Sequence, residues 1–326
     1  MILLTPEQPA EASNRPAAVM LFGAGLVGSA ISTTMQKSAT LAATTLPLDW
    51  HRADLFPEQL ALIETRFRDV MAQATESSGS ERAVQIVWSA GQAGFFSTDD
   101  QVARELELYE EVLHFIERMA CRYPTASFTM VLISSAGGLF EGQKGVGAGC
   151  VPMPTRPYSR LKLQQEQLLL NSTAPLSKKV YRLTSVYGYI RSRQRRGLIP
   201  TLVANGMCQR PSQITGYATT MRDYVWVDDV AEYISRTLLE EDFSPEDVVA
   251  ILGSGKPSSI LEIQQIVEKT ICRPLYLHFS PDVANGTTMS FDAGALPKNW
   301  RPSELSTNVR KIAVDAMSRQ TVFTDV

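Results

Sequence analysis

The sequence predicts a doubly wound parallel α/β sheet, and three features indicate this fold class. Short continuous apolar runs recur from Ala17 to Leu252, which is typical of strands that are buried on both faces of a sheet. Stretches with helical periodicity separate these runs, as expected when each parallel strand is followed by a crossover helix. The first run also leads directly into a turn that is rich in glycine.

The glycine-rich turn follows the first expected strand, residues 17–22. It reads Gly23-Ala24-Gly25-Leu26-Val27-Gly28 and opens a helical stretch to about Gln36. A strand, Gly-x-Gly-x-x-Gly and a helix, in this order, are what a dinucleotide-binding turn of the Rossmann fold requires. The glycines let backbone N–H groups approach a pyrophosphate, and the helix dipole favours its negative charge. We therefore expect Gly23, Gly25, Leu26, Val27 and Gly28 to contact a dinucleotide.

Acidic residues follow the second expected strand, residues 41–48. Asp49 lies at the spacing where an acid usually binds the adenosine ribose hydroxyls, and Asp54 comes shortly after it. An acid at this position repels a 2′-phosphate and favours NAD, but the nearby Arg52 could bind that phosphate, so NADP stays possible. The alternative is that Asp49 is only a solvated carboxylate at a strand end. Because Asp54 follows so closely, the usual next helix and strand have little room, and this part of the sheet is expected to be shortened.

Two further strands are expected to bring small residues to the same edge of the sheet. Residues 84–88 lead into Ser89-Ala90-Gly91, whose small side chains would let a cofactor pass close to the backbone. Residues 128–133 lead into Ser134 and Ser135 at a carboxyl end, the place where open α/β sheets bind ligands. A long amphipathic helix, residues 102–119, is expected between these two strands.

Tyr158 and Lys162 stand four residues apart at the start of a helix-forming run, residues 161–170. Positions i and i+4 share one face of a helix, so the ammonium should lie beside the phenol. A free tyrosine titrates at about 10, and a neighbouring cation stabilises its phenolate. Lowering this pKa to about 7 needs roughly 4 kcal/mol, which one lysine and a cofactor's positive ring could supply. The pair is a candidate acid/base; the alternative is a surface tyrosine beside an unrelated lysine.

A cluster of arginines follows the expected strand at residues 180–184. The chain first reads Ser185-Val186-Tyr187-Gly188 and then carries Arg191, Arg193, Arg195 and Arg196. Such a cluster is either a solvated loop or a place for substrate phosphates.

Composition and charge exclude several classes of protein. Of the 326 residues, 44% are hydrophobic and 20% charged, as in ordinary globular proteins. A net charge of -3 gives no reason to expect nucleic acid or an anionic membrane as a partner. No run approaches the roughly 18 apolar residues of a membrane span, and no secretory signal opens the chain, so a cytoplasmic protein is expected. The 4 cysteines and 3 histidines are scattered, so no metal site and no disulfide framework are expected.

Taken together, these motifs resemble the extended short-chain dehydrogenase/reductases, which include nucleotide-sugar epimerases, dehydratases and reductases. The resemblance runs from Val19 to Leu305. It rests on the glycine turn, the serines about two dozen residues before the Tyr-x-x-x-Lys pair, and three later motifs. These motifs are Leu183-x-x-Val186-Tyr187-Gly188, Arg222-Asp223-Tyr224-Val225-Trp226-Val227-Asp228-Asp229-Val230 and Gly253-Ser254-Gly255.

The resemblance implies roles for individual residues. Tyr158 would be the general acid/base for a sugar hydroxyl, while hydride moves between that carbon and the nicotinamide. Lys162 would hold the nicotinamide ribose and lower the pKa of the tyrosine. Ala136 and Gly138 stand where the family has its serine or threonine, so either Ser134 or Ser135 takes that role or no residue does.

The substrate is expected to be held by residues nearer the end of the chain. Arg222 matches an arginine that grips the pyrophosphate of a sugar nucleotide, the alternative being a structural ion pair with Asp228 or Asp229. Ser185 and Arg191 are further candidate contacts. The family's late arginine before a Gly-Asp pair is absent from Phe279-Ser280-Pro281-Asp282.

Three functions are consistent with the resemblance. The first is a nucleotide-sugar epimerase that keeps its NAD and acts by transient oxidation. The second is a reductase or dehydrogenase that exchanges NAD(P)H with solvent and reduces a keto-sugar. The third is a dinucleotide-binding regulatory protein without catalysis, against which the presence of both Tyr158 and Lys162 argues.

The resemblance also implies a domain organisation and an oligomeric state. Residues 15–185 and 221–253 would bind the dinucleotide, and residues 186–220 and 254–326 would form a smaller C-terminal α/β substrate-binding lobe. Residues 1–15, with Pro6 and Pro9, are predicted to be a flexible lead-in. A homodimer that pairs through the long helices is expected.

Overall fold

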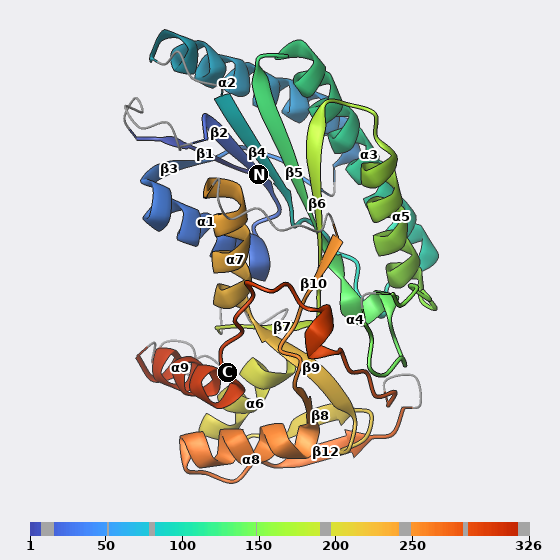
Figure 1. Cartoon of the computed structure of the whole chain (residues 1–326). Helices are drawn as coiled ribbons and strands as arrows, with labels where there is room; N and C mark the ends of the chain where they lie inside the picture. Colours follow the sequence, from blue (N-terminus) through green and yellow to red (C-terminus); the bar gives the residue numbers. More distant parts are fainter. Residues whose placement is uncertain are drawn as a thin grey trace. The chain divides into compact units, whose positions relative to one another are not determined.

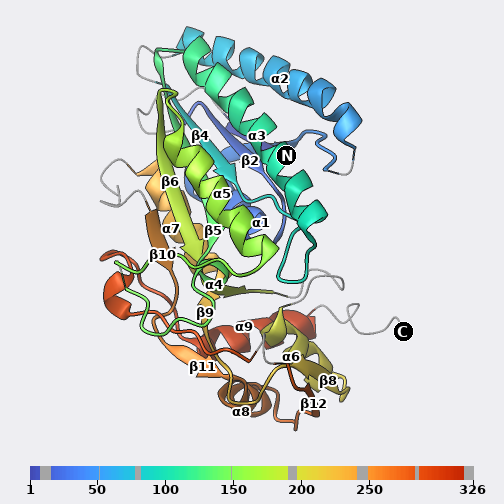
Figure 2. The ribbon, with the colours of Figure 1, turned by 90° about the vertical axis from the view of Figure 1, so that its right-hand side faces the viewer.

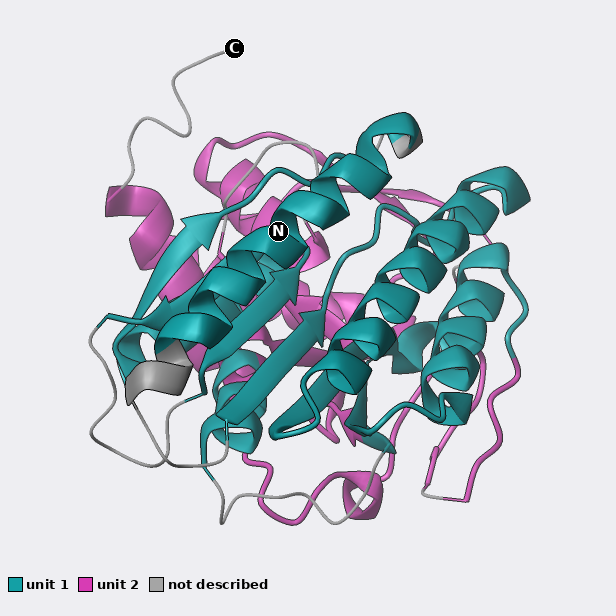
Figure 3. Ribbon diagram, turned by 90° about the horizontal axis from the view of Figure 1, so that it is seen from above, with its two compact units in different colours: residues 1–139, 154–182, 231–250 teal, residues 140–153, 183–230, 251–326 magenta. Residues whose placement is uncertain are grey.

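The computed structural model describes residues 1–7, 16–50, 52–77, 82–147, 149–189, 197–240, 249–282 and 286–318. The chain divides into two compact units, coloured separately in Figure 3. Unit 1 comprises residues 1–139, 154–182 and 231–250, and unit 2 comprises residues 140–153, 183–230 and 251–326. The predicted partition differs from these units mainly in placing residues 140–153 and 221–230 with the dinucleotide-binding part. The binding roles that were assigned to the two parts stay predictions.

A seven-stranded sheet is the centre of the described part of unit 1 (Figure 1). Its order is β10-β6-β5-β4-β2-β1-β3, and the central pairs β2–β4 and β4–β5 are parallel. β2 is wholly apolar, and most residues of β4 and β5 are apolar, because helices cover both faces of these strands. The predicted mostly parallel α/β sheet is confirmed. The strands are β1 (Ile2–Pro6), β2 (Ala18–Phe22), β3 (Leu41–Thr45), β4 (Arg82–Trp88), β5 (Ala126–Ser135), β6 (Leu176–Leu183) and β10 (Val249–Leu252).

The start of the chain is a strand, so the prediction of a flexible lead-in is wrong for residues 2–6. β1 lies between β2 and β3 and is antiparallel to both, with Ile2 opposite Leu21 on one side and Thr45 on the other. The side chain of Leu4 is fully buried, which gives this short segment a hydrophobic reason to join the sheet. The lead-in prediction relied on prolines and acids further along, whereas β1 forms through pairing with two strands that are distant in the chain.

In the part of the chain that the structure describes, the side of the sheet that ends in β3 lacks one strand, as predicted, although β1 adds another strand there. Between β3 and β4 the described residues form only a 3₁₀ turn, Ala53–Leu55, and the helix α2, Phe56–Ser77. The strand that usually follows in this fold is absent from the described residues, and β3 is the edge of the sheet.

Helices cover both faces of the sheet. Figures 1 and 2 show α2, α3 (Asp99–Arg122) and α5 (Pro157–Asn171) on one face and α1 (Leu26–Ala39) and α7 (Val227–Leu239) on the other. Fully buried aromatic side chains from α2, α3 and the strands, among them Phe67, Phe115 and Trp88, fill the first face. A capping box between Thr98 and Gln101 sets where α3 begins.

Unit 2 packs helices around two small sheets. A three-stranded sheet has the order β11-β9-β7, and β8 pairs with β12 in parallel. The hydrophobic core of unit 2 contains Ile199, Trp226, Ile263 and Ile312. The elements are β7 (Ser185–Tyr187), α6 (Leu198–Met207), β8 (Ser212–Thr215), β9 (Met221–Trp226), β11 (Pro257–Ser259), α8 (Ile260–Ile271), β12 (Leu277–Ser280) and α9 (Leu305–Ser318). Among the described helices of the whole chain, none is long and apolar enough to cross a membrane.

Leu4→Ala tests the place of β1 in the sheet. Because the Leu4 side chain is fully buried, its truncation should lower the free energy of unfolding by about 2–5 kcal/mol, measured by urea denaturation. Leu62→Ala is the matched control, since Leu62 is 42% exposed on α2, and its effect should stay within about 1 kcal/mol. Equal effects of the two substitutions would contradict the buried position of β1.

Candidate functional site

The candidate site lies where three parallel strands of unit 1 end. β2, β4 and β5 run in the same direction, so the segments that follow them meet at one edge of the sheet. The segment after β2 is the glycine turn, the segment after β4 begins at Ser89, and β5 ends in Ser134 and Ser135. The structure therefore brings the predicted cofactor turn and the predicted catalytic serines to the same edge.

Close contacts in the glycine turn exclude larger residues at two positions. Gly23 has φ +99°, and a Cβ there would lie 2.3 Å from Ala90 N. A Cβ on Gly28 would lie 1.9 Å from Gly23 O. Ser89 Oγ donates hydrogen bonds to Gly23 O at 2.7 Å and to Phe22 O at 3.2 Å. Ser89 and Ala90, which were predicted as cofactor contacts, thus pack against the glycine turn.

Gly25 and the start of α1 fit an anionic cofactor. A Cβ on Gly25 would meet nothing within 4 Å, so this glycine leaves open space instead of relieving a clash. Gly25 is the N-cap of α1, and no described side chain caps this end or adds a negative charge to the first turn. The N–H groups of the first turn of a helix lack partners within the helix, and its dipole attracts anions. The turn therefore suits the pyrophosphate of a dinucleotide.

The acids after β3 are both exposed. Arg52 donates from Nε to Asp54 Oδ1 at 2.9 Å and from Nη2 to Asp54 Oδ2 at 2.7 Å. These hydrogen bonds from Arg52 lower the pKa of the Asp54 carboxyl. Asp49 lies four residues beyond the end of β3, and its backbone N–H donates to Gln59 Oε1 at 2.8 Å. The arginine that could have bound a 2′-phosphate is thus held by a carboxylate.

Ser135 is the serine that reaches Tyr158. Pro157 occupies the first position of α5, where a proline needs no N–H partner, and Tyr158 follows it. The Tyr158 hydroxyl is hydrogen-bonded to Ser135, whose Oγ accepts from Gly138 N at 3.0 Å. A Cβ on Gly138 would come within 3.3 Å of Tyr158 Cε1, so the glycine makes room for the phenol ring. The hydroxyl groups of Ser135 and Tyr158 therefore lie next to each other, where both could contact one substrate oxygen.

Burial dominates the titration of Tyr158 in the protein alone. It raises the pKa of the phenol, while the hydrogen bond from Ser135 lowers this pKa and the charge of Glu105 raises it further. Lys162 Nζ lies 5.9 Å from the centroid of the Tyr158 ring, on the shared helix face that the spacing predicted. In the protein without a cofactor the pKa of Tyr158 is thus raised, and the lowering predicted for the lysine together with a cofactor's positive ring stays a prediction.

Lys162 is itself buried, with 6% of its surface exposed. Its ammonium donates to Gln165 Oε1 at 2.9 Å and lies 3.9 Å from Glu105 Oε1. Burial lowers the pKa of Lys162, and the charges of Glu105 and Glu166 oppose this effect. The sequence did not single out Glu105; nothing distinguishes it from the other acids of α3 until the fold places it opposite Lys162.

Ser134 belongs to a buried polar cluster around Glu166 of α5. Its Oγ donates to Glu166 Oε1 at 2.5 Å, and Arg182 Nη2 donates to Glu166 Oε2 at 2.6 Å. Glu166 is 1% exposed, so these partners satisfy a buried carboxylate. Both serines thus contact α5, Ser135 at Tyr158 near the start of the helix and Ser134 at Glu166 further along it.

Phe95 adds an aromatic ring to the surroundings of Tyr158. The two ring centroids are 5.6 Å apart, and the Arg156 guanidinium lies 5.3 Å from the centroid of Phe95. Phe95 is 40% exposed. An aromatic residue in this loop was not predicted to belong to the site.

The predicted substrate residues lie in unit 2. Arg222, on β9, donates from Nη1 to the carbonyls of Met221 and Thr287. Ser185 begins β7 and is paired with Tyr224 on β9. Asp229, one of the two carboxylates considered as a partner of Arg222, accepts from Ser303 N and Oγ. Arg191 lies outside the described residues.

The Arg-Asp motif on β9 also supports the fold of unit 2. Asp223 accepts hydrogen bonds from Thr184 Oγ1 at 2.8 Å and from Ser254 N at 2.7 Å. It is 1% exposed and joins three segments that are far apart in the chain. This structural role was not predicted from the sequence.

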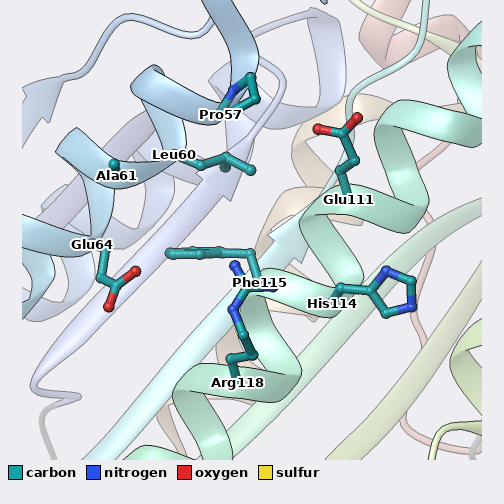
Figure 4. A pocket seen from close by; sticks show the side chains of 8 residues that line it. All are labelled: Pro57, Leu60, Ala61, Glu64, Glu111, His114, Phe115 and Arg118. Carbon is teal, nitrogen blue, oxygen red and sulfur yellow. The ribbon is translucent and has the colours of Figure 1, made fainter.

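A surface pocket of unit 1 is separate from the site. It lies between α2 and α3, and Figure 4 shows Phe115 among charged side chains of both helices. None of the predicted site residues lines it. Its lining consists of Pro57, Leu60, Ala61, Glu64, Glu111, His114, Phe115 and Arg118.

Gly25→Ala and Gly28→Ala test the two roles of the glycine turn. Gly28→Ala should lower the free energy of unfolding by about 1–3 kcal/mol, because its Cβ would overlap Gly23 O. Gly25→Ala should leave it within about 0.5 kcal/mol and weaken dinucleotide binding measured by calorimetry, because the methyl group enters the open space. If Gly25→Ala left the dinucleotide affinity unchanged, the proposed binding of the pyrophosphate at Gly25 would be contradicted.

Known proteins with a similar sequence or fold include several nucleotide-sugar epimerases. The dTDP-L-rhamnose 4-epimerase of Burkholderia thailandensis is 33% identical over 123 residues, which are 36% of this chain and 32% of that protein. The chain thus aligns with about a third of that relative's length. The UDP-glucose 4-epimerase of Thermus thermophilus, solved with NAD, is 19% identical with a TM-score of 0.68, covering 92% of this chain and 99% of that one. The UDP-glucuronic acid 4-epimerase of Bacillus cereus, solved with UDP-glucuronic acid and NAD, is 18% identical with a TM-score of 0.65, covering 93% and 99%.

These two solved structures establish the fold. The family is established by a sequence model described as the NAD dependent epimerase/dehydratase family, which matches residues 19–251. This range includes the glycine turn, the serines, the Tyr158–Lys162 pair and β9. Because it covers well over half of the 326 residues, the chain belongs to the NAD dependent epimerase/dehydratase family.

Proposed function

We propose that the chain is an NAD-dependent nucleotide-sugar epimerase that acts by transient oxidation of a sugar hydroxyl. The observation that carries this proposal is the grouping of Ser135, Tyr158 and Lys162 at the sheet edge that also holds the glycine turn. Membership of the epimerase/dehydratase family supports the reaction class.

The side chains of this group have distinct roles in the proposed reaction. Tyr158 accepts the proton of the sugar hydroxyl and returns it after the intermediate ketone has presented its other face. Ser135, already hydrogen-bonded to Tyr158, orients the same substrate oxygen. The ammonium of Lys162 stabilises negative charge on the phenol oxygen when the proton leaves. NAD, when bound in unit 1, would supply the hydride acceptor and donor that the transient oxidation needs.

The residues that would hold NAD belong to unit 1. Backbone groups of Gly23, Gly25, Leu26, Val27 and Gly28 would bind the pyrophosphate, and Asp49 the adenosine ribose. Ser89-Ala90-Gly91 would line the path toward the nicotinamide, and Lys162 would bind its ribose. NAD is favoured over NADP because a 2′-phosphate would meet Asp49 and would have to displace Asp54 from Arg52.

The substrate class follows from the relatives. These relatives are named for dTDP-L-rhamnose, UDP-glucose and UDP-glucuronic acid, all nucleoside diphosphate sugars. We therefore propose a nucleoside diphosphate sugar for this chain, held in part by Ser185, Arg191 and Arg222 of unit 2. A cytoplasmic homodimer is part of the same proposal.

Tyr158→Phe and a pair of serine substitutions test the acid/base group. Tyr158→Phe should reduce kcat by about 10²–10⁴-fold, measured by interconversion of a nucleotide sugar followed by NMR, because the phenol proton is lost. Ser135→Ala should also reduce kcat while the fold stays intact. Ser134→Ala is the matched control: it removes a partner of buried Glu166 and should lower the free energy of unfolding by about 1–3 kcal/mol. Full turnover by Tyr158→Phe would exclude the proposed acid/base role.

Analysis of the retained cofactor separates the epimerase from a reductase. The purified protein is denatured, and the supernatant is assayed for NAD(H) and NADP(H). An epimerase regenerates its own cofactor, so near-stoichiometric NAD is expected. An empty protein that binds added NADH or NADPH would contradict the proposal and favour a keto-sugar reductase.

A further inference from the structure

Glu105 connects two parts of the site through one buried carboxylate. It is on α3, and 9% of its surface is exposed. Its Oε2 accepts hydrogen bonds from Gln92 N at 2.8 Å and Ala93 N at 2.9 Å. These two N–H groups belong to the segment that follows β4. One carboxylate oxygen therefore holds the backbone that leads away from the predicted cofactor contacts.

The other oxygen of Glu105 faces the catalytic lysine. Oε1 lies 3.9 Å from Lys162 Nζ and has no hydrogen-bond partner among the described residues. Lys162, for its part, donates to Gln165 Oε1 at 2.9 Å. A buried carboxylate oxygen without a hydrogen bond is unfavourable unless a charge compensates it, and the ammonium provides this compensation.

Gly91 makes this position of Glu105 possible. A Cβ on Gly91 would lie 2.9 Å from Glu105 Oε1, closer than real Cβ contacts allow. Its φ is not in the left-handed region, so a glycine is needed here for the space that it leaves. The predicted cofactor contact Gly91 therefore also admits the carboxylate that faces Lys162.

We propose that Glu105 is a positioning residue for Lys162, joining the backbone after β4 to the lysine ammonium and fixing that cation beside Tyr158. This inference rests on the proposed function for its catalytic consequence, while the ion pair itself belongs to the protein without any ligand.

The charges around Lys162 determine the direction in which its pKa changes when Glu105 is neutralised. The groups that face Lys162 and Glu105 are Tyr158, Gln165 and Glu166 from α5, the Gln92 and Ala93 N–H groups, and Tyr109 of α3, whose hydroxyl donates to Gln165 O. Arg182 of β6 is engaged by Glu166. Burial lowers the pKa of Lys162. The charges of Glu105 and Glu166 both raise it, and the effect of Glu105 is the larger of the two. Removing the Glu105 charge must therefore lower the lysine pKa further.

Glu105→Gln tests the charge while keeping the backbone contacts. The amide oxygen of glutamine can still accept from Gln92 N and Ala93 N, but the group that faces Lys162 carries no charge. In the cofactor-free full chain with ¹³C-labelled lysine, the Lys162 side-chain resonance, assigned with Lys162→Met, should titrate at a lower pH than in the wild type. kcat for the nucleotide sugar should fall by roughly tenfold or more.

Two further variants complete the test. Gly91→Ala should displace the carboxylate and move the Lys162 titration in the same direction without changing any charged residue. Glu107→Gln removes an exposed acid from the same helix and should leave both the titration and kcat unchanged.

The outcomes are distinguishable from failure of the proposed function. An unchanged Lys162 titration in Glu105→Gln overturns the positioning role, even if the variant is less stable or less active. A lowered titration in both Glu105→Gln and Gly91→Ala supports that role. If the wild type converts no nucleotide sugar while the titration still shifts, the proposed function fails and the Glu105–Lys162 pair stands.

Discussion

The parallel pairing of β2, β4 and β5 is the constraint on which the site depends. Strands that run in one direction must end at one edge, and each is followed by a segment that has to cross that edge. The glycine turn, the Ser89 segment and Ser135 therefore meet although they are far apart in the chain. Gly23 and Gly28 allow the first two segments to approach each other as closely as they do.

Around this edge, charged side chains are buried only where partners compensate them. Lys162 has Gln165 and Glu105, and Glu166 has Ser134 and Arg182. Taking charges out of water is costly, and a buried pair often contributes little net stability. Such groups are explained better by the chemistry of the site than by stability. The two clusters share α5, where Lys162 and Glu166 are one helical turn apart, so the helix that carries Tyr158 is anchored by both.

Local sequence patterns predicted the parallel strands of the sheet, the glycine turn and the helix face that Tyr158 and Lys162 share. These features depend on residues that are close in the chain and on periodicities of two or 3.6 residues. β1 was missed because its pairing with β2 and β3 is a tertiary contact, and five residues carry little periodicity. The choice between Ser134 and Ser135 required the direction of each side chain at the end of β5.

Contacts between distant segments were beyond what the sequence could indicate. Glu105 is one of many acids on α3, and its meeting with Lys162 depends on the packing of α3 against α5. Asp223 was read as part of a motif, yet its role in joining Thr184 to Ser254 emerges only in the folded chain. In each case one polar side chain bonds segments that no local pattern relates.

The fate of hydrogen at the reacting carbon tests transient oxidation most directly. A nucleotide sugar that the protein converts would be prepared with deuterium on that carbon, and the product examined by NMR and mass spectrometry. The proposed mechanism predicts that deuterium stays on the same carbon in both epimers, because the hydride leaves and returns within one closed site. Loss of the label to solvent, or its recovery on a dinucleotide released into solution, would contradict the mechanism.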